Sequence, residues 1–218
     1  ALPIWYMRTI FRKELADYFT SVRFLILLVL ILLTSALTLY FDYKGIGEIG
    51  STGFIFLRLF TNQPEGVPNL FYFTNLIALF IVPIIGIALG FDAINGERSS
   101  GTISRTLSQP IFRDSVINAK FLAGLFTLSI MVIATVLLIS GFGLRLLGVP
   151  PSLEEIFRLF IYLVFTIIYG AFWMSLAILF SVVFRRVSTS LLTSMALWLF
   201  FGLFLLLIAP AIANTIAP

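Results

Sequence analysis

The chain has 218 residues, of which 60% are hydrophobic and 11% are charged, and its formal net charge is +4. A soluble domain of this size cannot bury so much apolar surface, so the composition indicates an integral membrane protein. The sequence holds no Cys and no His, which excludes disulfides, thiol nucleophiles, imidazole bases and most transition-metal sites.

Residues 4–20 carry apolar side chains at helical spacing, with most of the charged residues off that stripe. The stripe consists of Ile4, Met7, Phe11, Leu15 and Tyr18. Aromatic side chains suit the headgroup level of a bilayer, and Arg and Lys suit an anionic leaflet. We therefore expect an amphipathic helix that lies in the membrane interface. A targeting sequence is the alternative, but no small-residue cleavage site follows the next apolar run.

Five long apolar segments follow, at about residues 22–41, 69–93, 117–146, 157–184 and 187–209. At about 1.5 Å per residue, each is close to the length that crosses a hydrocarbon core about 30 Å thick. The predicted fold class is therefore all-α, a polytopic transmembrane helical bundle, with residues 1–218 forming a single transmembrane domain.

Short motifs predict how two of these spans are built. Pro83 should kink the second span, and Gly86 with Gly90 forms a GxxxG pair that lets another helix approach closely. Such a pair serves ordinary packing within one subunit as well as a dimer face. Ser152 and Glu155 form a capping-box pattern, which predicts a helix start before the fourth span.

The Lys and Arg residues are divided unevenly between the two sides of the predicted bundle. One side holds Arg8, Arg12, Lys13, Arg23, Arg98, Arg105, Arg113, Lys120, Arg185 and Arg186; the other holds Lys44, Arg58, Arg145 and Arg158. Ten of the 14 cations thus share a side with the N-terminus. The positive-inside rule predicts a cytoplasmic N-terminus. We expect a multi-pass protein of the plasma membrane.

Residues 92–120 form the one long polar interruption between apolar segments that is both basic and helix-like. We expect Gly96 to close the second span in the left-handed conformation and Glu97 to fall at a new helix start. Pro110 prevents that helix from continuing. The expected product is a short helix at residues 96–110, held crosswise between two long helices. A solvated connector is the simpler interpretation of the same stretch.

The order of residues here, Glu97-Arg98-x-x-Gly101-Thr102, then Leu107-Ser108-x-Pro110, then Arg113 and Lys120, resembles the coupling-helix region of one transporter family. That family is the type 2, exporter-like class of ATP-binding cassette (ABC) transporter permeases. Its permeases dimerise, and each coupling helix docks into a groove on a cytoplasmic ATP-binding subunit. The resemblance implies that the docking element is formed by Glu97, Arg98, Gly101, Thr102, Ile103, Arg105, Leu107, Pro110 and Arg113.

Two features depart from that family. Its members normally have six spans with both termini inside, and the sequence here starts with Ala1 and shows five. We therefore expect the chain to be a fragment or the visible part of a longer one. Phe112 also stands where such sequences often have a small hydroxyl residue, which changes the cap of the helix that follows.

The sequence offers no chemistry of its own. It has no GxxxxGK[ST] phosphate loop, and no Asp, Glu, Lys or Arg lies in the central part of any predicted span. We expect no catalytic, cofactor or metal residues; the resemblance implies that a partner subunit binds ATP and Mg. Because the cations sit beside apolar spans, nucleic acid is not an expected partner.

The predicted function is that of a permease subunit, which is not itself an enzyme. It would move substrate across the membrane by coupling to a separate ATP-binding subunit, beside a second permease subunit that is identical or related. The alternative is a membrane anchor or scaffold that transports nothing and recruits a cytoplasmic partner through the same helix.

Overall fold

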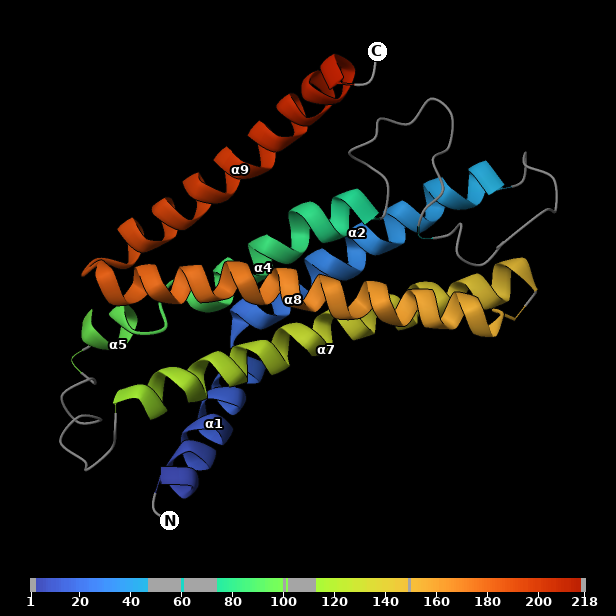
Figure 1. The fold of residues 1–218 in the computed structure, drawn as a ribbon. Helices are drawn as coiled ribbons and strands as arrows, with labels where there is room; N and C mark the ends of the chain where they lie inside the picture. The colour runs from blue at the N-terminus through green and yellow to red at the C-terminus, as the bar shows by residue number, and fades with distance from the viewer. Residues whose placement is uncertain are drawn as a thin grey trace.

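The computed structural model describes residues 3–46, 60, 74–99, 101, 113–148 and 150–216. Within these residues the elements are helices and turns, and no strand is present. In Figure 1 most of the longer helices lie along one another, the C-terminal helix slants away from them, and the N-terminal helix crosses one end of the bundle. The predicted all-α polytopic bundle is confirmed.

The first two helices are separated by one residue. Helix α1 covers Pro3–Thr20 and helix α2 covers Val22–Ile46. Ser21 lies between them, where its backbone N–H donates to the Tyr18 carbonyl and its Oγ accepts from the Phe24 N–H at 3.1 Å. Because this hydroxyl satisfies a donor that a helix start leaves open, Ser21 ends one helix and caps the next.

The predicted kink at Pro83 takes the form of a change in helix type. A π-helix, η2, covers Thr74–Ile81, and an α-helix, α4, covers Val82–Gly90. Pro83 lies in the first turn of α4, where a residue without an N–H breaks no α-helical hydrogen bond. The wider helical turns therefore end where the proline begins a regular α-helix.

Three long helices complete the bundle: α7 (Arg113–Leu147), α8 (Leu153–Val183) and α9 (Val187–Ile216). The predicted capping box before α8 is confirmed. The Ser152 N–H donates to Glu155 Oε2 at 2.8 Å, and the Glu155 N–H donates back to Ser152 Oγ at 3.3 Å. Two backbone donors at this helix start are satisfied in this way.

The glycine pair of α4 serves packing within the subunit. A Cβ atom at Gly86 would lie 2.5 Å from the carbonyl oxygen of Gly170, and one at Gly90 would lie 2.6 Å from that of Met174. Both neighbours belong to α8, so the two backbones touch where side chains would otherwise separate them. Met174 is fully buried beside this contact and joins the main apolar core.

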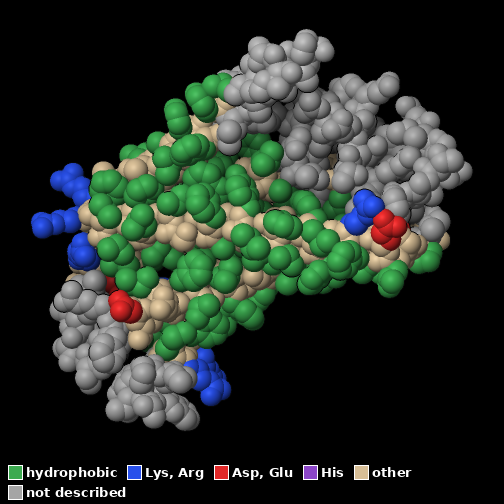
Figure 2. All heavy atoms as spheres, in the orientation of Figure 1, with side chains coloured by type: hydrophobic (Ala, Val, Ile, Leu, Met, Phe, Trp, Pro, Cys, Tyr) green, Lys and Arg blue, Asp and Glu red, His purple; other side chains and the backbone are tan. Residues whose placement is uncertain are grey.

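Four stretches of the described helices are long and apolar enough to cross a membrane: Val22–Tyr40, Leu76–Ser99, Asp114–Arg145 and Leu153–Val183. A shorter apolar stretch covers Val187–Gly202 of α9. Hydrophobic side chains cover the middle of the face seen in Figure 2, and most of the charged side chains on it lie toward the ends of the helices. This distribution suits a bundle with lipid around its middle.

Candidate functional site

The polar stretch 92–120 begins with a short helix that is held by α8. After α4 ends at Gly90, the chain turns and forms α5 (Asn95–Ser99). The backbone N–H groups of Ile94 and Asn95 donate to the hydroxyl of buried Ser181 in α8, at 2.9 and 3.1 Å. A side chain from another helix thus caps α5, which fixes the position of its first turn.

The prediction for Gly96 was wrong, whereas that for Glu97 is confirmed. Gly96 donates its N–H to the Asp92 carbonyl at 3.0 Å within a helical turn, and the glycine in the left-handed conformation is Gly101, with a φ of +71°. Helix α5 therefore ends at Ser99, because Gly101 takes the chain out of the helix. Glu97 lies in the first turn of α5.

Only part of the predicted docking element can be placed. Glu97, Arg98 and Gly101 lie at α5, and Arg113 begins α7. Five of the predicted residues lie outside the described residues: Thr102, Ile103, Arg105, Leu107 and Pro110. Whether these positions dock a partner stays a prediction.

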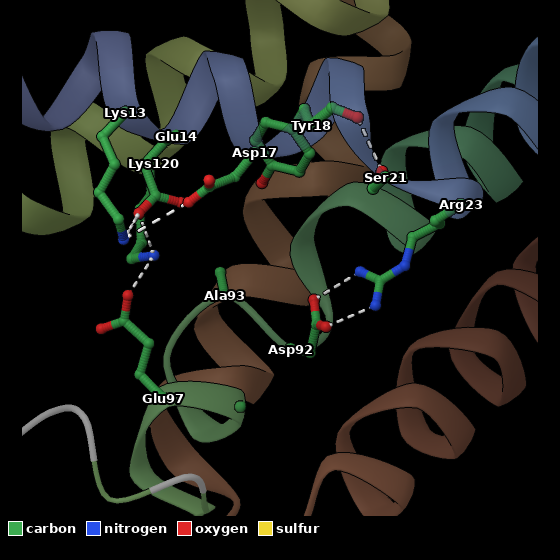
Figure 3. A pocket seen from close by; sticks show the side chains of 11 residues that line it. Lys13, Glu14, Asp17, Tyr18, Ser21, Arg23, Asp92, Ala93, Glu97 and Lys120 are labelled. Carbon is green, nitrogen blue, oxygen red and sulfur yellow. Dashed lines mark hydrogen bonds and ion pairs between the residues drawn. The ribbon is translucent and has the colours of Figure 1, made fainter.

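A buried lysine joins α5 to two other helices. Lys120 in α7 has a side chain only 5% exposed, and its Nζ lies 2.8 Å from Glu97 Oε1 and 2.9 Å from Glu14 Oε1. Figure 3 shows the two carboxylates, one from α5 and one from α1, converging on this amine. We call Glu14, Glu97 and Lys120 the charge cluster. It links the start of the polar stretch to the N-terminal helix through α7.

Helical spacing explains why these charges are buried. Lys120 lies on the same face of α7 as Val116, Ala123 and Thr127, which are all buried. Glu14 is buried on the face of α1 that packs against α7. The helical pattern of residues 4–20 placed Glu14 off the apolar stripe, and Lys120 entered only the count of cations and the family resemblance, with no ion pair predicted for either residue. The available signal was a lysine at helical spacing from small and apolar residues on both sides.

A second ion pair fixes the end of α4 to α2. Arg23 donates to both carboxylate oxygens of Asp92, from Nη1 at 2.9 Å and from Nη2 at 2.7 Å, and its guanidinium lies 5.1 Å from the centre of the Phe91 ring. Two-point contacts of this kind constrain orientation as well as distance. Nearby, the Tyr18 hydroxyl donates to the Leu89 carbonyl at 2.9 Å, which fixes the end of α1 to α4.

The electrostatics of α1 follow from these contacts. Burial lowers the pKa of Lys13, but attraction to Glu14, Asp17 and Glu97 outweighs burial, so the pKa lies above its ordinary value. Burial raises the pKa of Tyr18, and the negative charges of Glu14 and Asp92 raise it further. Lys13 therefore stays charged and Tyr18 stays neutral at physiological pH.

The charged groups surround a cavity of about 560 Å³ whose lining includes Ser21 and Gly96. Among the described residues, no group of three or more acidic side chains is placed to hold a metal ion. Lys and Arg engage the acidic groups that line the cavity: Glu14, Asp17, Asp92 and Glu97. The arrangement suits a role in holding the surrounding helices together.

Comparison with known proteins identifies the family. The family described as "ABC-2 family transporter protein" matches residues 8–218. A protein of Pseudomonas aeruginosa named "Probable ABC transporter permease protein NosY" is 31% identical over 199 residues, which cover 89% of this chain and 66% of that protein. A protein of the same name from Stutzerimonas stutzeri is 29% identical over 145 residues, covering 66% of this chain and 46% of its own length.

The chain thus spans less than two thirds of the length of the curated relatives that it matches. The family match, however, covers almost every residue, from residue 8 in the first half of α1 to residue 218. Its apolar helices, together with this match, make it a multi-pass membrane protein. The chain belongs to the ABC-2 family of transporter proteins.

Proposed function

We propose that this chain is the membrane-spanning permease subunit of an ATP-driven ABC transporter and that it works with a separate cytoplasmic ATP-binding subunit. The family match and the permease names of both relatives support this function. Coupling between the polar stretch and the membrane helices is supported by one observation. Lys120 of α7 forms ion pairs with Glu97 of α5 and Glu14 of α1.

In this proposal the stretch 92–120 receives force from the ATP-binding subunit. Movement of α5 would pass to α7 through Glu97 and Lys120, and from there to α1 through Glu14. The same movement would reach α8 through the hydrogen bonds to Ser181. A small displacement at one cytoplasmic segment would thereby be shared by helices that cross the membrane.

The remaining parts of the proposal follow from the family. The N-terminus and the stretch 92–120 lie in the cytoplasm, as the distribution of Lys and Arg favours. The partner subunit binds ATP and Mg, and a second permease subunit, identical or related, completes the translocation path in the plasma membrane.

The test is a pull-down from native membranes with a tag on the N-terminus, followed by an ATPase assay of the purified material. We expect an ATP-binding subunit to be recovered with the wild-type chain and lost from a double variant, Ile103→Asp with Leu107→Asp. Leu153→Asp is the matched control. It makes the same chemical change at an 86% exposed residue in the first turn of α8, which is predicted to lie on the opposite side of the membrane.

Three results would count against the proposal. If no nucleotide-binding subunit is recovered, the chain is not part of an ATP-driven transporter. If the double variant recovers as much of that subunit as the wild type, residues 96–110 do not dock it. A recovered partner whose ATP hydrolysis does not depend on this chain would indicate the alternative function, a membrane anchor.

A further inference from the structure

A second cavity, of about 660 Å³, lies between α1 and α7 and is distinct from the one beside the charge cluster. Its walls are three residues of α1 and four of α7: Met7, Arg8, Phe11, Leu122, Leu125, Phe126 and Ser129. The rings of Phe11 and Phe126 meet edge to face, with centroids 6.2 Å apart. The two helices therefore touch inside the cavity without filling it.

The chemistry of this α1–α7 cavity is an apolar slot with one cation. The Ser129 hydroxyl donates to the Leu125 carbonyl of its own helix at 2.7 Å, so it is already satisfied. Arg8 is exposed and makes no ion pair within the described part of the chain. A guanidinium without a carboxylate partner, beside an apolar slot, is complementary to a molecule with an anionic head and a hydrocarbon tail.

The cavity also opens toward the surface that suits lipid. Leu122 and Phe126 are 37% and 48% exposed, and the exposed apolar surface of α7 continues along the helix through Ile133 and Leu137. No water-filled path is needed for a hydrocarbon chain to enter from the bilayer, because an acyl chain would leave one apolar environment for another.

We propose that the α1–α7 cavity binds a membrane phospholipid with an anionic headgroup. One acyl chain lies between the two helices, and the headgroup lies at Arg8. Phe11 lies about one turn from Glu14 on α1, and Leu122 lies two residues after Lys120 on α7. A lipid in this place would therefore hold α1 on α7 and support the contact between Glu14 and Lys120. The proposal requires no partner subunit.

The first test titrates the purified full chain in detergent with phosphatidylglycerol or with phosphatidylcholine of the same acyl chains, and counts bound lipid by native mass spectrometry. We expect one phosphatidylglycerol to bind more tightly than phosphatidylcholine. Arg8→Gln should weaken the binding of phosphatidylglycerol about fivefold, which is the effect of one cation near an anionic lipid surface. The same variant should leave the binding of phosphatidylcholine unchanged. Arg12→Gln is the matched control, because Arg12 is exposed one turn further along α1 and does not line the cavity.

The second test fills the slot. Leu125→Trp should reduce the binding of both lipids, whereas Leu137→Trp, at a 65% exposed residue outside the cavity, should reduce neither. Equal weakening by Arg8→Gln and Arg12→Gln would overturn the proposal, since it would indicate diffuse attraction to the headgroups. Unchanged binding by a folded Leu125→Trp chain would overturn it as well. If that variant does not fold, the comparison of Arg8 with Arg12 decides.

Discussion

The contact between α4 and α8 and the contact among α1, α5 and α7 use opposite chemistry. At Gly86 and Gly90 the backbone of α4 lies directly on the backbone of α8, with no side chain between them. In the charge cluster, three long side chains reach toward one another from three helices. The first contact requires that Gly86 and Gly90 have no side chain. The second requires that the positive charge of Lys120 offset the negative charges of Glu14 and Glu97.

This difference determines how each contact can change. Backbones that touch have no second arrangement of similar energy, because any shift opens a void or creates a clash. An ion pair can exchange partners, and Lys13 already lies 3.5 Å from both Glu14 and Asp17. We infer that α4 and α8 move as a unit, whereas α1, α5 and α7 form the joint that can adjust.

The largest expected effect comes from removing the central cation of the charge cluster. Lys120→Met leaves Glu14 and Glu97 facing each other in a mostly buried place, and losing one partner of a buried pair costs about 3–5 kcal/mol. We expect the free energy of unfolding in detergent micelles to fall by about 3 kcal/mol, measured by titration with a denaturing detergent.

Lys13→Met is the matched control for that variant, because Lys13 also pairs with Glu14 but is 64% exposed. Exposed pairs contribute at most about 1 kcal/mol, so its effect should be small. Adding Glu14→Gln and Glu97→Gln to Lys120→Met should restore part of the lost stability, since the two negative charges that Lys120 balances would then be absent. Equal losses for Lys120→Met and Lys13→Met would show that burial is not what makes the cluster important.

The next effect tests the glycine contact. Gly86→Ala places a Cβ atom 2.5 Å from the Gly170 carbonyl oxygen, and a backbone atom cannot rotate away. We expect a loss of about 1–3 kcal/mol in the free energy of unfolding, measured in the same way. Gly170→Ala should cost less, because its new Cβ would meet side-chain atoms of Val82 and Leu128 and not a backbone atom.

Gly141→Ala is the neutral control in that series. No atom lies within 4 Å of a Cβ at Gly141, which lies within α7. Alanine favours a helix over glycine by up to about 1 kcal/mol, so this variant should be as stable as the wild type or slightly more so. A loss at Gly141 as large as that at Gly86 would contradict the role given to the α4–α8 contact.

The same contrast explains what the sequence could predict. The GxxxG pair and the capping box at Ser152 and Glu155 are local patterns, in which the spacing itself carries the geometry. The helical bundle was predictable for the same reason, since long apolar runs leave few alternatives. Such features depend on neighbours along the chain, and the sequence displays those neighbours directly.

The charge cluster depends on residues that are far apart in the sequence. Nothing near Lys120 indicates that Glu14 and Glu97 meet it, because this requires knowing how α1 and α5 pack against α7. The left-handed glycine was misplaced for a related reason. Both Gly96 and Gly101 can adopt that conformation. The start of α5 is set by hydrogen bonds from the Ile94 and Asn95 N–H groups to Ser181, and this acceptor lies on a helix far away in the sequence.

The smallest expected effect concerns Tyr18, at the boundary between the two contacts. Its hydroxyl donates to the Leu89 carbonyl in α4, so it connects the adjustable helix α1 to the fixed pair. Tyr18→Phe keeps the ring and removes that hydrogen bond. At neutral pH we expect a loss of about 1 kcal/mol in the free energy of unfolding, the usual value for one such bond.

The pH dependence of this variant distinguishes the hydrogen bond from packing. Burial raises the pKa of Tyr18 in the folded chain, so its contribution to stability is complete below the unfolded pKa of about 10 and is lost as the pH rises through the folded value. Above about pH 10 the wild-type unfolded state releases the phenolic proton and the folded state does not, which favours unfolding. The Tyr18→Phe variant has no such proton. We therefore expect the difference in stability between the wild type and the variant to shrink from about pH 9 to about pH 11, as measured by thermal unfolding in micelles. Parallel curves for the two chains over this range would show that the Tyr18 hydroxyl is not held in the buried contact between α1 and α4.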